Sequence, residues 1–217
     1  MIAPSVLVQE NNLAVTALSY GYYEEAFRIM REATTKLNRM PPPAENYFCQ
    51  QRRWSYPIQS SPVGPLCGAP EQENASMFRR AILLADQEDN VPVVASVVLF
   101  NLALCHHIMG TTFNVSKRIG VALRFYRMAY QIIEENRDFC VFGDLLLLAV
   151  INNIAESSAQ LYEVKRAKKW FTFLSRILGV AATGGRILPA LGEDDYVFFY
   201  VNAMLHQGDT LTVSPAA

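Results

Sequence analysis

This sequence has no excess of charge of either sign and no recognisable catalytic motif. It has 19 Lys and Arg against 20 Asp and Glu, a formal net charge of -1, so no overall field attracts nucleic acid or an acidic membrane. The patterns G-x-S-x-G, G-x-x-x-x-G-K-[ST] and H-E-x-x-H are all missing. We therefore expect no nucleic-acid partner, no enzyme activity and no cofactor.

Cysteine patterns of the kind that form disulfide frameworks or metal sites are also missing. Cys49, Cys67, Cys105 and Cys140 lie far apart, without a C-x-x-C pair, which is typical of reduced thiols. Residues 1–12 contain no basic region, and their apolar run is too short for a signal peptide. The expected location is cytoplasmic.

Long hydrophobic runs exist but are interrupted. Val91 to Ile108 is shorter than the roughly 20 apolar residues of a membrane span, and it contains Asn101. The second run, Phe139 to Ala155, contains Asp144 and two asparagines. Polar groups of this kind are costly at the centre of a lipid-facing helix, so we expect buried core helices and no transmembrane span.

What the sequence does contain is a recurring tripeptide of asparagine, a large aliphatic residue and alanine. It occurs as Asn12-Leu13-Ala14, Asn101-Leu102-Ala103 and Asn153-Ile154-Ala155, each within an apolar helical pattern. The recurrence predicts three equivalent first helices, each followed by a second helix that turns back on it.

The small residues after each tripeptide support this repeat. Ala14 is followed by alanine after 12 and then 7 positions, at Ala26 and Ala33. In the third unit Ala167 lies 12 positions after Ala155, and Leu174 a further 7 on. The middle unit runs from Ala103 through Ala122 to Ala129 and matches if seven residues are inserted near Gly110 to Lys117. Small side chains at these places allow neighbouring helices to approach closely.

The pattern resembles the tetratricopeptide repeat (TPR), a helix-turn-helix unit of about 34 residues with small residues at the helix crossings. Gly21 and Gly110 match its turn glycine and Tyr23 its turn tyrosine, whereas Leu174 is a large residue at a small position. The Asn-Asn-Leu-Ala run is similar to that of kinesin light chains. The chain also resembles a group of TPR-like proteins from unicellular algae, which implies no activity.

The resemblance implies an all-α fold, a right-handed superhelical stack of three TPR-like helical hairpins. Its expected parts are repeat 1 at 5–38, repeat 2 at 91–136 with an internal insertion, repeat 3 at 141–182, a closing helix at 194–206 and a tail at 207–217. Residues 39–90 interrupt any helical period with many prolines, beginning at Pro41, and form an insertion. Within it, Met77 to Ala85 is predicted to pair as a β-ribbon with Tyr47 to Tyr56.

The asparagines are the main candidate site. Stacking equivalent helices places Asn12, Asn101 and Asn153 in a row along the concave groove, and side-chain amides can bind the backbone of an extended peptide whatever its sequence. The resemblance to kinesin light chains implies that the asparagines bind a peptide in this way. The alternative is structural, with each amide satisfying a backbone group of its own chain. The expected walls of the groove, which would set specificity, are Leu104, His107, Ile108, Glu156 and Gln160.

The expected function is thus a non-catalytic module that binds a protein or peptide partner in the concave groove. One alternative is a membrane-associated helical bundle, and another is an enzyme using Cys105 or Cys140 with His106 or His107. The aromatic part of the insertion, including Trp54 and Tyr56, is a candidate for occupying the groove until a partner competes. The sequence specifies neither the partner nor the oligomeric state.

Overall fold

The computed structural model describes residues 3–40, 59–65, 76–136, 144–184 and 191–206, which are mostly helical. Within these ranges the helices are α1 (Pro4–Ser19), α2 (Tyr23–Leu37), α3 (Val91–Thr112), α4 (Ser116–Glu135), α5 (Asp144–Gln160), α6 (Val164–Gly184) and α7 (Glu193–Leu205). Two short strands, β1 (Ser60–Pro62) and β2 (Arg80–Ile82), pair antiparallel. The all-α expectation is confirmed at this level.

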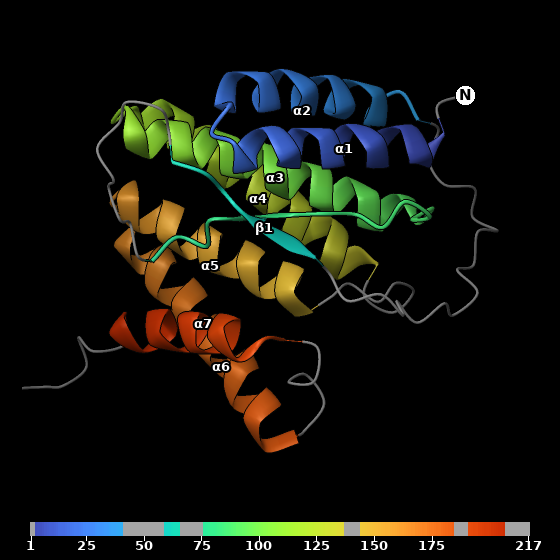
Figure 1. Ribbon diagram of the computed structural model, residues 1–217. Coiled ribbons are helices and arrows are strands. Elements are labelled where there is room, and N and C mark those ends of the chain that lie inside the picture. Colours follow the sequence, from blue (N-terminus) through green and yellow to red (C-terminus); the bar gives the residue numbers. More distant parts are fainter. Residues whose placement is uncertain (1–2, 41–58, 66–75, 137–143, 185–190, 207–217) are drawn as a thin grey trace, which may run out of the picture.

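Consecutive helices form three hairpins, α1 with α2, α3 with α4 and α5 with α6, followed by α7 (Figure 1). The first helices of successive hairpins also contact one another, from α1 through α3 and α5 to α7. The hairpin core contains all the predicted small positions, because each is 5% exposed or less: Ala14, Ala26, Ala33, Ala103, Ala122, Ala129, Ala155, Ala167 and also Leu174.

The three turns within the hairpins are equivalent. Each contains three residues, and the middle one has a left-handed backbone: Gly21 with φ 77°, Asn114 with φ 53° and Tyr162 with φ 59°. A left-handed residue is a common way to end a helix. The prediction that Gly110 is a turn glycine is therefore wrong, because Gly110 lies inside α3 and Asn114 takes the turn position.

The seven extra residues of the middle unit extend its helices instead of forming a loop. Helix α3 continues for about three turns beyond its repeated asparagine, whereas α1 and α5 continue for about two turns beyond theirs. Helix α4 begins about one turn earlier, relative to Ala122, than α2 begins relative to Ala26. On the side of the turn, each helix of the middle hairpin thus extends about one helical turn further than its counterparts, and the facing positions stay in phase.

Helix starts follow the sequence in most places. Asn90 caps α3 by accepting a hydrogen bond from the Val93 N–H, and Pro92 lies in the first turn. An acidic run, Glu193 to Asp195, forms the first turn of α7, where negative charge is favourable. Ser116 is the first residue of α4, and Val115, the residue before it, makes no side-chain capping hydrogen bond.

Helix α3 lies at the centre of the protein. Among the described residues it alone is long and apolar enough to cross a membrane, and 83% of its apolar 18-residue stretch is buried inside the protein.

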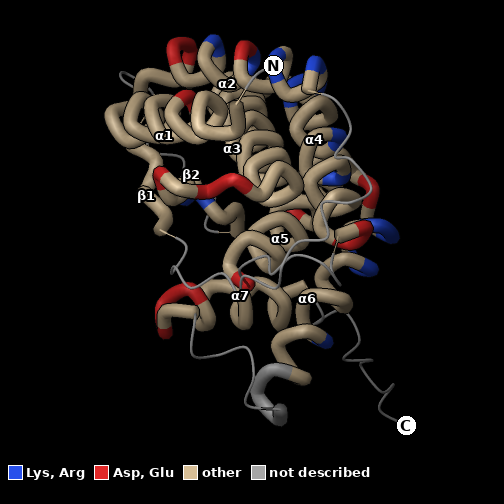
Figure 2. Tube along the Cα trace, turned by 90° about the vertical axis from the view of Figure 1, so that its right-hand side faces the viewer, with Lys and Arg blue, Asp and Glu red and all other residues tan. Residues whose placement is uncertain are grey.

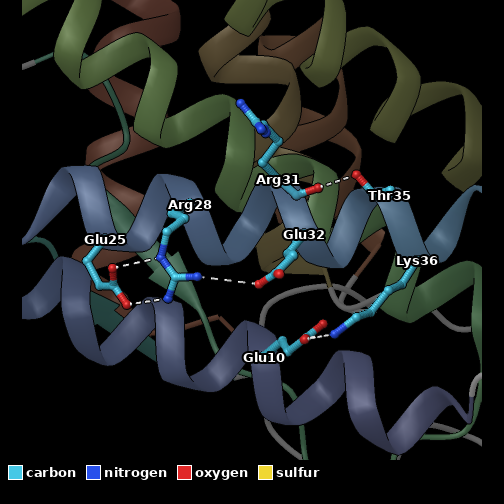
Figure 3. Close-up of polar contacts among 7 residues, drawn as sticks. All are labelled: Glu10, Glu25, Arg28, Arg31, Glu32, Thr35 and Lys36. Carbon is cyan, nitrogen blue, oxygen red and sulfur yellow. Dashed lines mark hydrogen bonds and ion pairs between the residues drawn. The ribbon is translucent and has the colours of Figure 1, made fainter.

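At the outer surface of the first hairpin, Lys36 of α2 pairs with Glu10 of α1, and Arg28 lies between Glu25 and Glu32 (Figure 3). Exposed pairs such as those of Arg28 contribute little stability.

Gly110 allows α3 and α4 to approach, which gives a stability prediction. A Cβ at this position would lie 2.7 Å from Ile119 Cγ1 and 3.0 Å from the Ile119 backbone nitrogen. We expect Gly110→Ala to lower the free energy of unfolding by about 1–3 kcal/mol through overpacking. Gly120 of α4 is the matched control, since a Cβ there meets nothing within 4 Å. Gly120→Ala is expected to stabilise by about 0.5–1 kcal/mol. Equal effects in urea denaturation would contradict the close approach.

Candidate functional site

The three repeated asparagines bind one extended stretch of the chain's own backbone. This stretch is Ser76–Leu84, here called the bound segment, which contains β2. Each asparagine accepts from the N–H of one residue and donates to the C=O of the same residue. The pairs are Asn153 with Phe78 (2.9 and 3.1 Å), Asn101 with Ile82 (2.9 and 2.8 Å) and Asn12 with Leu84 (2.9 and 2.8 Å).

Three further asparagines, which sequence reasoning did not select, complete the row. Asn11 donates to the Ile82 carbonyl at 3.0 Å and accepts from Asn101. Asn152 and Asn202 both donate to the Ser76 carbonyl, at 2.9 and 2.7 Å. The available signal was the doublet: two of the three motifs read Asn-Asn. We call the six residues the asparagine ladder: Asn11, Asn12, Asn101, Asn152, Asn153 and Asn202.

The ladder is almost completely buried and its amides are well satisfied. All members except Asn12 are at most 3% exposed. Asn153 donates to the Tyr126 hydroxyl as well as to the Phe78 carbonyl, and its oxygen accepts from Phe78 N–H and from Asn152. Buried amides with a full set of partners fix the position of whatever they hold.

The other edge of the bound segment is paired with the chain as well. In the β1–β2 pair, Ser60, Ser61 and Pro62 lie opposite Ile82, Ala81 and Arg80. The pairing continues outward, because Val63 N–H donates to the Arg79 carbonyl and Leu83 N–H to the Gln59 carbonyl. Backbone groups of even-numbered residues thus face the ladder and those of odd-numbered residues face β1, as strand geometry requires.

Helix packing explains why one strand can reach all three hairpins. Phe78 and Leu84 are six positions apart, a span of about 20 Å at about 3.3 Å per residue. The same span covers two steps between neighbouring helices at about 8–10 Å each. The bound segment therefore crosses the first helices in reverse order, from α7 and α5 at Ser76 to α1 at Leu84 (Figure 1).

Side chains of the bound segment add contacts to the last helices. The Phe78 ring stacks on Phe199 with centroids 5.2 Å apart and meets Phe198 edge-on at 5.7 Å. Arg80 Nη1 lies 3.2 Å from Asp195 Oδ1. Five residues of the segment are at most 3% exposed: Met77, Phe78, Ala81, Ile82 and Leu84.

These contacts correct the prediction for the insertion. A β-ribbon is present, in which β2 pairs with β1 at Ser60–Pro62. Residues 47–56, including Trp54 and Tyr56, lie outside the described residues. The segment that lies along the asparagine row is Ser76–Leu84, the other half of the predicted ribbon.

Four of the five expected groove walls are buried, and Gln160 is partly buried. Leu104 and Ile108 are at most 1% exposed and belong to the core, so neither presents an open wall. His107 is fully buried, with Nε2 3.0 Å from Gln160 Oε1 and Nδ1 3.4 Å from Ser157 Oγ. Gln160 Nε2 in turn donates to Glu156 at 2.8 Å. The three polar members of the expected walls therefore form one connected network.

The cysteine–histidine pair proposed for the enzyme alternative has an unfavourable setting. Burial raises the pKa of the Cys105 thiol to about 12, so it stays protonated near neutral pH. Burial also lowers the pKa of His106 and of His107 to about 4. In the part of the chain that the structure describes, no three His, Cys, Asp or Glu side chains are grouped to hold a metal ion. Cys140 lies outside that part.

Comparison with known proteins adds no family to this geometry. No protein-family model matches the chain, and the comparisons with curated proteins and with solved structures found no match.

Proposed function

We propose that the chain is a non-catalytic protein-interaction module, a superhelical stack of TPR-like hairpins whose asparagine ladder binds extended backbone. The supporting observation is the bound segment itself, in which both the N–H and the C=O of Phe78, Ile82 and Leu84 pair with ladder amides. An amide that pairs with backbone alone accepts any side chain beside it. In this proposal a partner segment takes the place of the bound segment.

The contacts of the bound segment suggest which partners fit. Phe78 fills an aromatic position against Phe198 and Phe199, and Arg80, the next residue but one, pairs with Asp195. A partner peptide would carry an aromatic residue and an arginine with this spacing, followed by aliphatic residues. Because the bound segment is tethered, its effective concentration is on the order of millimolar, so a partner has to compete with it.

The second candidate function is structural, with the ladder serving only to clamp the insertion onto the hairpins. The near-complete burial of the ladder, and the burial of five of the nine residues of the bound segment, favour this alternative. The two functions differ in one measurable respect. A binding ladder accepts the same sequence supplied as a separate peptide, whereas a structural clamp is formed once, during folding.

A labelled peptide with the sequence of residues 74–86 separates these functions. The receptor is the full chain carrying Phe78→Ala and Arg80→Ala, which removes the two side-chain anchors of the bound segment and leaves the ladder intact. By fluorescence anisotropy we expect micromolar binding to this variant and binding at least about tenfold weaker to the unmodified chain, since each 1.4 kcal/mol changes affinity tenfold.

The control peptide carries an N-methyl group at Phe78, which removes the donor to Asn153 and keeps the side chain. We expect its affinity to fall by about tenfold or more. Circular dichroism establishes that the double variant is folded. Weak peptide recognition is still detected at about 100 μM. If the variant is folded but binds neither peptide at this concentration, the proposed function is contradicted and the structural function remains.

A further inference from the structure

Helix α7 presents a continuous apolar surface to solvent. The exposed side chains recur at spacings of three and four residues, which places them on one side of the helix. We call this surface the α7 stripe: Val197 (51% exposed), Tyr200 (47%), Val201 (45%), Met204 (47%) and Leu205 (70%). Beyond the acidic first turn, every exposed residue of α7 is aliphatic or aromatic.

The opposite side of α7 fixes this orientation. Phe199 and Ala203 are buried in the core, and Asn202 donates hydrogen bonds to the Ser76 carbonyl and to Asn152. Helix α7 cannot rotate to hide the stripe without breaking these hydrogen bonds. Figure 2 shows charge at the start of α7 and none along the remainder.

The other hairpins show what covers such a surface. The first helices α1, α3 and α5 pack against one another in series, and each is covered by its own second helix, α2, α4 or α6. Helix α7 contacts α5 and α6 as the first helix of a fourth unit would. Among the described residues no helix follows it. The end of a helical stack is normally polar on its outer side, and this end is not.

We propose that the α7 stripe binds the α7 stripe of a second copy, antiparallel, so that each helix serves as the missing second helix of the other. The interface is continuous with the series of helix pairs that builds the rest of the fold, and a two-fold axis through Val201 makes it self-complementary. Charge favours the antiparallel direction. Glu193 lies eight residues, about 12 Å, from that axis, so the acidic turns of two copies lie about 24 Å apart, beyond the Debye length.

Sedimentation velocity over a wide concentration range tests this proposal with the full chain. We expect the unmodified chain to dimerise, and Val201→Glu to weaken dimerisation by at least about tenfold, because like charges meet at the axis. Val201→Lys should weaken it similarly. In an equimolar mixture of the two variants opposite charges meet at the axis. The mixture should therefore recover at least about half of the lost dimer affinity, measured as the logarithm of the dissociation constant. The control is Val164→Glu, an exposed apolar position at the start of α6.

Loss in both single variants with recovery in the mixture supports pairing through α7. A monomeric unmodified chain at about 200 μM, far above the dissociation constants of stable homodimers, overturns the proposal and leaves the stripe to a helix of another protein. Dimers that Val164→Glu weakens as much as Val201→Glu, or that the mixture does not recover, overturn it as well. Position 201 is exposed, so circular dichroism should show all variants folded.

Discussion

Asn101→Ala is expected to lower the free energy of unfolding by about 3–5 kcal/mol, because it leaves several buried polar groups with fewer partners. These groups are the Ile82 N–H, the Ile82 carbonyl and the Asn11 side-chain oxygen, in a site that water does not reach. Each buried polar group left unsatisfied costs about 1–3 kcal/mol, and the deleted side chain also leaves a small cavity. Urea denaturation followed by circular dichroism measures the loss.

Asn12→Ala is the matched control for this substitution. Asn12 forms the same pair of hydrogen bonds, with Leu84, but it is only partly buried and lies at the end of the ladder. Water can replace the lost amide there, so the expected loss is about 1 kcal/mol. Similar losses for the two variants would show that burial of the ladder does not determine its contribution to stability.

Acid is expected to destabilise the protein strongly through His107. In the folded chain burial lowers the pKa of His107 to about 4, opposed by the Gln160 hydrogen bond and reinforced by the charge of Arg79. The ordinary value is 6.5, so between pH 6.5 and 4 the unfolded state binds a proton that the folded state does not. The contribution of neutral His107 to the free energy of unfolding is therefore fully present above about pH 6.5. It decreases by on the order of 3 kcal/mol as the pH falls to about 4.

His107→Gln provides the comparison that isolates this effect. Glutamine cannot be protonated in this range and keeps an amide donor for Gln160. The variant is expected to be less stable at pH 7, because glutamine does not fill the site of the imidazole, but its stability should fall less steeply as the pH is lowered to about 4. His106, whose pKa is also lowered to about 4, contributes equally to both proteins. Parallel pH profiles from urea denaturation would show that His107 accepts a proton without penalty.

Much of the helical arrangement could be predicted because it is encoded locally. The repeat of Asn-aliphatic-Ala and the recurring spacing of the alanines place the helices, and α2 (Tyr23–Leu37) lies within the predicted repeat 1, 5–38. The extra seven residues near Gly110 were detected from the same spacing. Whether these residues form helix or loop could not be predicted, because two more helical turns and a loop of the same length leave equal gaps in the pattern.

The contents of the asparagine row could not be predicted. A ladder that binds main-chain atoms imposes no side-chain pattern on its ligand, so Ser76–Leu84 carried no mark that related it to Asn12 or Asn153. The partner of β2 was missed for a related reason: three-residue strands such as Ser60–Pro62 are too short to show alternation. Leu104 and Ile108 follow Asn101 on the same helix, and a position on a helix gives the direction of a side chain but not what lies over it.

The path of Ser76–Leu84 has a consequence for how the protein comes apart. A linear array of helical units usually loses its ends first, because each unit touches only its neighbours. Here one stretch from the middle of the sequence is held by α1 at one end and by α7 at the other. Loss of either terminal helix therefore loosens the strand that the other terminal helix also holds, and we expect the chain to unfold in one transition instead of unit by unit.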